Sequence, residues 1–345
     1  MHSGGGTVTQ SRPGAFITGV AGTALTGEEH AFLAEADPLG FILFDRNVDS
    51  PEQLRRLTGT LREAVGRDAP VLIDQEGGRV ARLRPPHWRD WPAPLDQVAR
   101  AGPRAEQVMR LRYAIIAAEL RAVGIDVNCA PCTDVARPDT HAVLHNRCYG
   151  DVPDTVSRIA RAVAEGLLSG GVLPVLKHIP GHGAATTDSH LELPRVDLPR
   201  DTLQKVDFAP FAALADLPVG MTAHVVYAAF DPDRPATTSP GMITLIRQGI
   251  GFNGLLMSDD ISMGALNGGI ADRCRAALAA GCDVILHSNG DLAEMRAVAA
   301  ASGRMGQRAA QRAEAALALR RAPEADLGAL VAEWDALMRA ETADG

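Results

Sequence analysis

The chain has 345 residues, of which 46% are hydrophobic and 22% charged, and it carries a net charge of -8. This composition is typical of a globular protein with a sizeable core and excludes a disordered chain. Proteins that bind nucleic acid or anionic membranes usually carry a basic excess, whereas this chain has 34 Lys and Arg against 42 Asp and Glu. We therefore expect neither partner.

Three features predict a cytoplasmic protein. No apolar run approaches the ~18 residues of a membrane helix. The first 13 residues are rich in Gly, Ser and Thr and lack the apolar core of a signal peptide. The five cysteines follow no disulfide pattern, which agrees with a reducing compartment.

Eight short apolar runs alternate with helical patterns along the chain. Each run is apolar throughout, as strands covered on both faces should be. The predicted strands are 15–20, 40–44, 70–75, 126–131, 172–177, 220–226, 254–260 and 282–288.

The segments between these runs carry apolar residues at helical spacing, for example Val156, Ile159 and Val163. Ser50 followed by Pro51 predicts a helix start. Three glycines follow predicted helices, namely Gly66, Gly170 and Gly281. We expect each of them to adopt the left-handed conformation that ends a helix.

Eight such units predict a single-domain (β/α)8 TIM-type barrel, which is an α/β fold. The rival is an open doubly wound sheet, but the turn after the first strand lacks its G-x-G-x-x-G loop. We expect a flexible N-terminus over 1–13, the catalytic barrel over 14–302, and C-terminal helices over 303–345 that pack on the barrel.

Polar residues follow several of the predicted strands, at the end of a barrel where active sites form. One such strand ends in Asp259-Asp260. A carboxylate there can act as a nucleophile, base or ligand, and strand alternation lets only one of the two face the barrel mouth. The alternative is that one aspartate caps the turn at 261–263.

Asp188 and His190 are two residues apart in a Gly-containing loop, so both can project to the same side. A carboxylate that fixes the imidazole tautomer makes a competent general acid/base. The alternative is an Asx-turn beside a surface histidine. The Gly content predicts a mobile flap that brings His190 to the substrate.

Two further patterns have competing interpretations. His178 and His182 have metal-ligand spacing and, with Asp188 and His190, allow a metal cluster, although Pro180 and the neighbouring glycines favour a loop. The C-x-x-C pair Cys129 and Cys132 ends a buried strand, so we interpret it as two buried cysteines rather than a redox motif.

Five motifs in this order resemble those of the single-domain bacterial β-N-acetylglucosaminidases of glycoside hydrolase family 3, the cytosolic β-hexosaminidases of peptidoglycan recycling. The resemblance covers about 14–290. The motifs are Asp74-Gln75-Glu76-Gly77-Gly78-Arg79-Val80, Asn146-Arg147-Cys148-Tyr149-Gly150, Lys177-His178-Ile179-Pro180-Gly181-His182-Gly183, Asp188-Ser189-His190 and Ser258-Asp259-Asp260-Ile261-Ser262-Met263.

The resemblance implies a retaining mechanism with a covalent glycosyl-enzyme. Asp259 matches the nucleophile, His190 the acid/base, and Asp188 its dyad partner. The residues that match those binding the hydroxyls of N-acetylglucosamine are Asp74, Arg82, Arg147, Lys177 and His178.

The implied substrate is a small glycan, an N-acetylglucosaminyl anhydromuropeptide fragment of the cell wall, and the implied state is a monomer. We expect no cofactor and no metal ion. The alternatives are a related family 3 β-glycosidase or glycoside phosphorylase, a metal-dependent barrel hydrolase using His178, His182 and His190, and a non-catalytic sugar-binding barrel.

Overall fold

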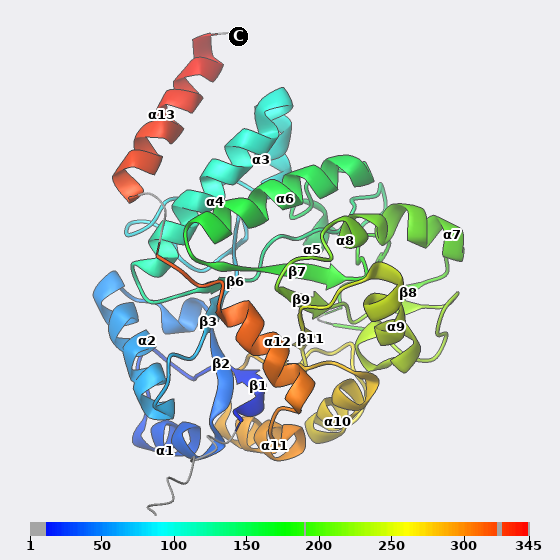
Figure 1. Ribbon diagram of the computed structural model, residues 1–345. Coiled ribbons are helices and arrows are strands. Elements are labelled where there is room, and N and C mark those ends of the chain that lie inside the picture. The colour runs from blue at the N-terminus through cyan, green and yellow to red at the C-terminus, as the bar shows by residue number, and fades with distance from the viewer. Residues whose placement is uncertain (1–11, 190, 323–325, 344–345) are drawn as a thin grey trace, which may run out of the picture.

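The computed structural model describes residues 12–189, 191–322 and 326–343, and eight of its strands are parallel and close into a barrel (Figure 1). The ring closes where β12 pairs with β1. This confirms the predicted (β/α)8 barrel and excludes the open sheet. The barrel strands are β1 (Gly14–Thr18), β2 (Pro38–Leu43), β3 (Val71–Ile73), β6 (Val127–Asn128), β7 (Leu173–Ile179), β9 (Val219–Thr222), β11 (Leu255–Asp260) and β12 (Val284–His287).

Helices connect the strands and surround the ring (Figure 1). Two short pairs, β4 (Gln75–Gly77) with β5 (Val80–Ala81) and β8 (Arg195–Val196) with β10 (Val226–Tyr227), lie outside the barrel. The helices are α1 (Gly27–Ala36), α2 (Pro51–Val65), α3 (Pro94–Ala101), α4 (Ala105–Arg121), α5 (Ala142–His145), α6 (Pro153–Ser169), α7 (Arg200–Thr202), α8 (Ala209–Ala213), α9 (Pro240–Thr244), α10 (Ile270–Ala280), α11 (Leu292–Ser302), α12 (Gln307–Leu317) and α13 (Leu327–Ala343).

Most of the predicted helix boundaries are confirmed. Ser50 caps α2 with its side chain, and Gly66 ends that helix in the left-handed region at φ 63°. Gly281 likewise follows α10 at φ 117°. The prediction for Gly170 is wrong, because it has φ -84° and the left-handed residue is the next one, Gly171, at φ 74°.

Helix α12 crosses the N-terminal end of the barrel, opposite the end where the strands carry polar residues (Figure 1). Arg312 on this helix pairs with Asp283, which precedes β12, at 2.8 Å. Arg320, just beyond the helix, pairs with Asp126, which precedes β6, at 2.6 Å. The buried alanines of α12 join the apolar cluster of the barrel interior. This helix therefore closes the barrel floor.

Helix α13 stands apart from α12 at the edge of the molecule (Figure 1). It packs on α4, and the ring of its Trp334 meets that of Trp91, which precedes α3, edge to face at 5.0 Å. The division between barrel and C-terminal helices at 302/303 stays a prediction. Nearly all of the predicted flexible segment 1–13 lies outside the described residues.

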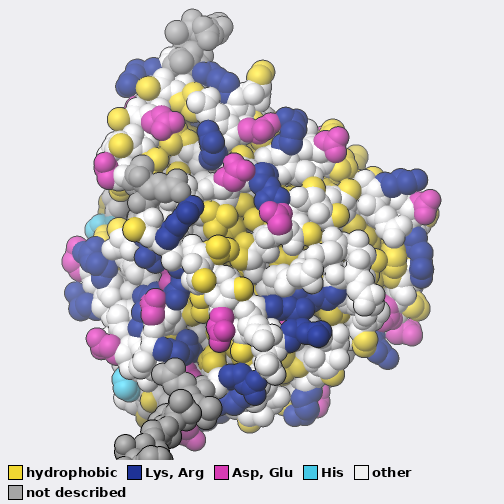
Figure 2. Space-filling view, in the orientation of Figure 1, with side chains coloured by type: hydrophobic (Ala, Val, Ile, Leu, Met, Phe, Trp, Pro, Cys, Tyr) yellow, Lys and Arg dark blue, Asp and Glu magenta, His cyan; other side chains and the backbone are white. Residues whose placement is uncertain are grey.

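On the face shown in Figure 2, acidic and basic side chains are interspersed. No helix in the described part of the chain combines the length and the apolar character that a bilayer crossing needs.

Candidate active site

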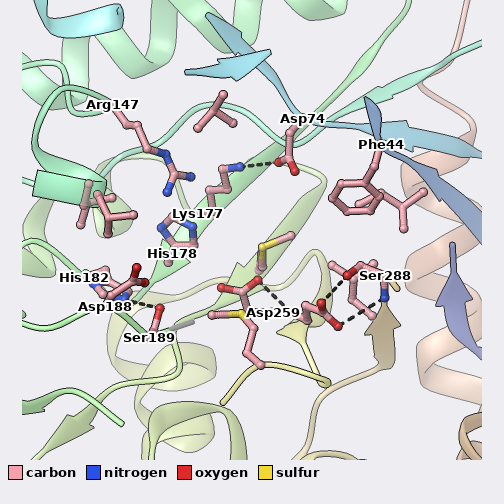
Figure 3. A pocket seen from close by; sticks show the side chains of 18 of the residues that line it. Phe44, Asp74, Arg147, Lys177, His178, His182, Asp188, Ser189, Asp259 and Ser288 are labelled. Carbon is pink, nitrogen blue, oxygen red and sulfur yellow. Dashed lines mark hydrogen bonds and ion pairs between the residues drawn. The ribbon is translucent and has the colours of Figure 1, made fainter. Parts of the chain in front are cut away.

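A cavity of about 420 Å³ opens at the C-terminal ends of the barrel strands (Figure 3). Its volume lies in the usual range for small-molecule sites. His190 is outside the described residues, so its position is not described. All the other site residues predicted from the sequence line this cavity: Asp74, Arg82, Arg147, Lys177, His178, Asp188 and Asp259.

The hairpin after β3 brings two of these residues together. Gln75 accepts hydrogen bonds from the backbone N–H of Arg82 at 2.8 Å and of Leu83 at 3.0 Å, which folds β5 back on β4. The Arg82 guanidinium then donates to Asp74 Oδ2 at 3.1 Å. The buried side chain of Gln75 thus holds the Arg82 guanidinium close to the Asp74 carboxylate at the cavity wall.

Glu76 is a site residue for which the sequence predicted no individual role. It accepts two hydrogen bonds from the Arg147 guanidinium, at 2.9 and 2.7 Å, and lies 2.7 Å from Lys177 Nζ. Lys177 also donates to Asp74 Oδ1 at 2.9 Å. The sequence offers one indication of a role for Glu76. It lies two residues after Asp74, and side chains two residues apart in an extended segment point to the same side.

This network holds its members in their charged forms. Burial alone would raise the pKa of the Glu76 carboxyl, but Arg147 and Lys177 outweigh it and lower the pKa to about 2. Burial alone would lower the pKa of Lys177, but Asp74 and Glu76 raise it above its ordinary value. The cavity therefore presents fixed donors beside a fixed acceptor, which suits the hydroxyls of a neutral sugar.

Asp134 is a second residue to which the sequence assigned no role. Its Oδ2 lies 2.7 Å from His178 Nδ1, and its Oδ1 accepts from the backbone N–H of His182 at 2.6 Å. Although burial acts in the opposite direction, His178 and His182 hold the pKa of Asp134 below its usual range. The carboxylate therefore fixes the ring of His178, which is 5% exposed at the cavity wall.

Asp259 and Asp260 end β11 in different surroundings. Asp260 accepts from Ser262 Oγ at 2.8 Å and from Ser262 N at 3.1 Å, and it also bonds the hydroxyl of Ser288. It therefore caps the following turn, as the alternative interpretation of the pair predicted. Asp259 Oδ1 accepts from the backbone N–H of Asp260 at 2.8 Å.

Both aspartates line the cavity, so the expectation that only one faces the mouth is wrong. The pairing of β11 with β12 shifts register between Met257 and Asp260, and such an irregularity breaks the alternation of a regular strand.

Asp259 is ionised under ordinary conditions. Burial alone would raise the pKa of its carboxyl, but His178, His224, the Asp260 N–H and Lys177 together lower it. His224 itself has a pKa lowered by burial and is therefore neutral near pH 7.

The segment that follows β7 is a loop, as its Pro and Gly content predicted. Tyr227 Oη donates to Gly181 O at 2.6 Å, and His182 Nε2 lies 3.2 Å from Ser189 Oγ. Burial, with the neighbouring His178, lowers the pKa of His182 to about 4, so this ring is neutral. Asp188 lies with His182 and Ser189 at one side of the cavity, away from Phe44 (Figure 3).

Cys129 and Cys132 are buried free thiols, which confirms the prediction that they are not a surface redox pair. The metal-type cluster found among the described residues differs from the predicted alternative. It joins Cys132, Asp134 and His178, whereas the predicted alternative joined His178, His182, Asp188 and His190, of which His190 lies outside the described residues.

Comparison with known proteins gives a family. Residues 18–318 match the glycosyl hydrolase family 3 N-terminal domain. A β-hexosaminidase of Alkalilimnicola ehrlichii is 40% identical over 284 residues, which are 80% of this chain and 81% of that protein.

Two solved structures share the fold. NagZ from Neisseria gonorrhoeae, in complex with N-trifluoroacetyl-D-glucosamine, superimposes with a TM-score of 0.85 at 30% identity, over 97% of this chain and 98% of that chain. A family 3 β-N-acetylglucosaminidase from Paenibacillus gives a TM-score of 0.81 at 30% identity over 88% of this chain. This chain spans only 60% of the Paenibacillus protein. The chain belongs to glycosyl hydrolase family 3 and is a glycoside hydrolase.

Proposed function

We propose that this enzyme is a retaining exo-β-N-acetylglucosaminidase. The observation that carries the proposal is the ionised Asp259 in the same cavity as the Asp74–Lys177–Glu76–Arg147 network. The Asp259 carboxylate is suited to attack the anomeric carbon of a sugar, and the network is suited to bind the hydroxyls of the same sugar.

In the first step Asp259 attacks C1 and forms an ester, while the bond to the leaving oxygen breaks. That oxygen takes a proton from His190, which Asp188 orients. In the second step His190 accepts a proton from water, the water oxygen bonds to C1, and the ester bond to Asp259 breaks. Two inversions give net retention.

The remaining predicted residues bind the sugar. Asp74 accepts from hydroxyl groups, and Arg82, Arg147 and Lys177 donate to sugar oxygens. The Nδ1 proton of His178 is donated to Asp134 at 2.7 Å, so the other ring nitrogen, Nε2, accepts from a sugar hydroxyl. When the sugar displaces water from these groups, the local dielectric constant falls and each hydrogen bond becomes stronger.

The comparisons support an N-acetylated amino sugar as the glycone. The curated relatives are named β-hexosaminidases, and the Neisseria structure holds N-trifluoroacetyl-D-glucosamine. The cavity of about 420 Å³ suits a terminal sugar rather than a polymer. The low aromatic content, 4%, agrees, because long glycan clefts rely on aromatic stacking.

Arg79 supports an anionic aglycone. It lines the cavity and bonds the backbone carbonyl of Val143, and among the described residues it has no ion-pair partner within 4.0 Å. Arg79 lines the same cavity as Asp188, the proposed partner of the acid/base that serves the leaving group. A muramyl residue without a peptide carries a free lactyl carboxylate, and a muropeptide carries carboxylates on its peptide stem. We therefore propose muropeptide fragments as substrates, in cytoplasmic cell-wall recycling by a monomer.

The test is hydrolysis of N-acetylglucosaminyl-β-1,4-anhydromuramyl peptide, followed by proton NMR. The proposal predicts first-formed β-N-acetylglucosamine, at a rate that does not need phosphate. A first-formed α-anomer would refute retention, and product formed as a sugar phosphate would establish a phosphorylase instead.

A further inference from the structure

A second polar cluster lies directly behind His178, on the side away from the cavity. One ligand atom from each of Cys132, Asp134 and His178 lies within 4.8 Å of the others. Asp134 Oδ2 is 2.7 Å from His178 Nδ1 and 3.4 Å from Cys132 Sγ. The Cys132 thiol has no part in the proposed reaction.

Thiolate, carboxylate and imidazole are together a donor set for a soft divalent cation, and three protein ligands leave one position open. Metal–ligand bonds of about 2.0 to 2.3 Å in tetrahedral geometry separate the donors by roughly 3.3 to 3.7 Å. The pair of Cys132 and Asp134, at 3.4 Å, already has this separation. The pair of His178 and Asp134, at 2.7 Å, must open by less than about 1 Å.

The charges of such a site also balance. When a cation binds, the Cys132 thiol loses its proton to solvent, and the His178 proton moves from Nδ1 to Nε2. The thiolate and the Asp134 carboxylate then neutralise the two positive charges of the ion. This balance matters because Cys132 and Asp134 are fully buried, where a net charge is costly.

We propose that Cys132, Asp134 and His178 form a site for a soft divalent cation such as Zn²⁺ or Cd²⁺, and that the bound ion inhibits the enzyme. The ion breaks the 2.7 Å hydrogen bond that orients His178 and engages the carboxylate that holds His182 N. His178 lines the sugar cavity, so its displacement disturbs the sugar site. Entry past a ring that is only 5% exposed makes the inhibition slow to develop.

The matched variants are Cys132→Ser and Cys274→Ser. Cys274 is a buried thiol of α10 in the main apolar core, and it lies outside the donor set. The first measurement is the absorbance of the protein titrated with Co²⁺, in the near-ultraviolet band of cobalt–thiolate bonds. It reports metal binding without turnover, so its result does not depend on which sugar is cleaved.

The proposal predicts one thiolate-bound cobalt in the wild type and in Cys274→Ser, and affinity lowered by about 100-fold or more in Cys132→Ser. An unchanged band in Cys132→Ser would overturn it, as would no band in the wild type. If Cys132→Ser does not fold, as judged by thermal melting, Cys132→Val removes the same ligand with a side chain suited to the apolar cluster.

The second measurement is hydrolysis of 4-nitrophenyl N-acetyl-β-D-glucosaminide after preincubation with Cd²⁺, each variant being compared with its own metal-free rate. We expect slow inhibition of the wild type that EDTA reverses, little inhibition of Cys132→Ser, and none by Mg²⁺, which prefers oxygen ligands. Equal inhibition of the wild type and Cys132→Ser would place the inhibitory ion elsewhere, for example at Asp188 and His190, and would refute the proposed site.

Discussion

Replacing Glu76 by Gln removes the charge at the centre of the sugar-binding network while nearly preserving the shape of the side chain. In the wild type this carboxylate lies 2.7 Å from Lys177 Nζ and accepts two hydrogen bonds from Arg147. In Glu76→Gln, Arg147 loses the carboxylate that it pairs with, and Lys177 keeps only Asp74, which also pairs with Arg82. We expect the variant to lose both stability and activity.

Two arguments give a similar magnitude for the lost stability. Breaking a buried ion pair by removing one partner costs about 3 to 5 kcal/mol. The pKa of Glu76 falls from 4.5 to about 2 on folding, and this difference corresponds to about 3 kcal/mol at neutral pH. The free energy of unfolding should therefore fall by about 3 kcal/mol or slightly more.

The same contribution has a predictable pH dependence. Because folding lowers the pKa of Glu76, its stabilisation is fully present above about 4.5 and is lost as pH falls towards about 2. Residue 76 cannot titrate in Glu76→Gln. The difference in unfolding free energy between the two proteins should therefore shrink by about half or more between pH 7 and pH 3.

The assays are urea unfolding at several pH values and kcat/KM for 4-nitrophenyl N-acetyl-β-D-glucosaminide. We expect kcat/KM to fall by about 100-fold, as misplaced binding groups typically cause. The control is Glu52→Gln, which breaks an exposed pair with Arg55 and should leave the unfolding free energy nearly unchanged. If Glu76→Gln matched this control in both stability and activity, the network would have no such role.

Three further predictions concern the reaction. Asp259→Asn should be essentially inactive in the same chromogenic assay, and full activity would remove the proposed nucleophile. His190→Ala should slow poor leaving groups by about 10²- to 10⁴-fold and good ones much less, because only the former need protonation; equal losses would argue against an acid/base role. Arg79→Gln should lower kcat/KM for an anhydromuramyl aglycone several-fold more than for a neutral one, whereas Arg84→Gln, which changes an exposed neighbour, should not discriminate between the two. Equal effects of Arg79→Gln on both substrates would refute recognition of the carboxylate.

All eight barrel strands could be predicted from the sequence, because strands buried on both faces appear as short apolar runs between helices. The cavity location followed from the same pattern, since side chains at the C-terminal ends of parallel barrel strands must meet. Asp259 was found in this way, Asp74 and Lys177 were identified through the family resemblance, and the structure places all three around one cavity.

The roles of Glu76 and Asp134 could not be predicted, because they depend on partners distant in the chain. Glu76 meets Arg147 across 71 positions, and Asp134 meets His178 across 44. No spacing rule connects such residues before the barrel closes. The different roles of Asp259 and Asp260 also depend on a register shift in β11 that no local sequence signal announces.

The most direct test of the central claim is to identify the residue that becomes covalently attached to the sugar. The enzyme would be incubated with a slow 5-fluoro-N-acetylglucosaminyl substrate, digested, and analysed by tandem mass spectrometry. The account predicts one labelled peptide, with the sugar on Asp259. A label on Asp260 or on any other residue would contradict it, as would steady turnover of the probe with no covalent intermediate.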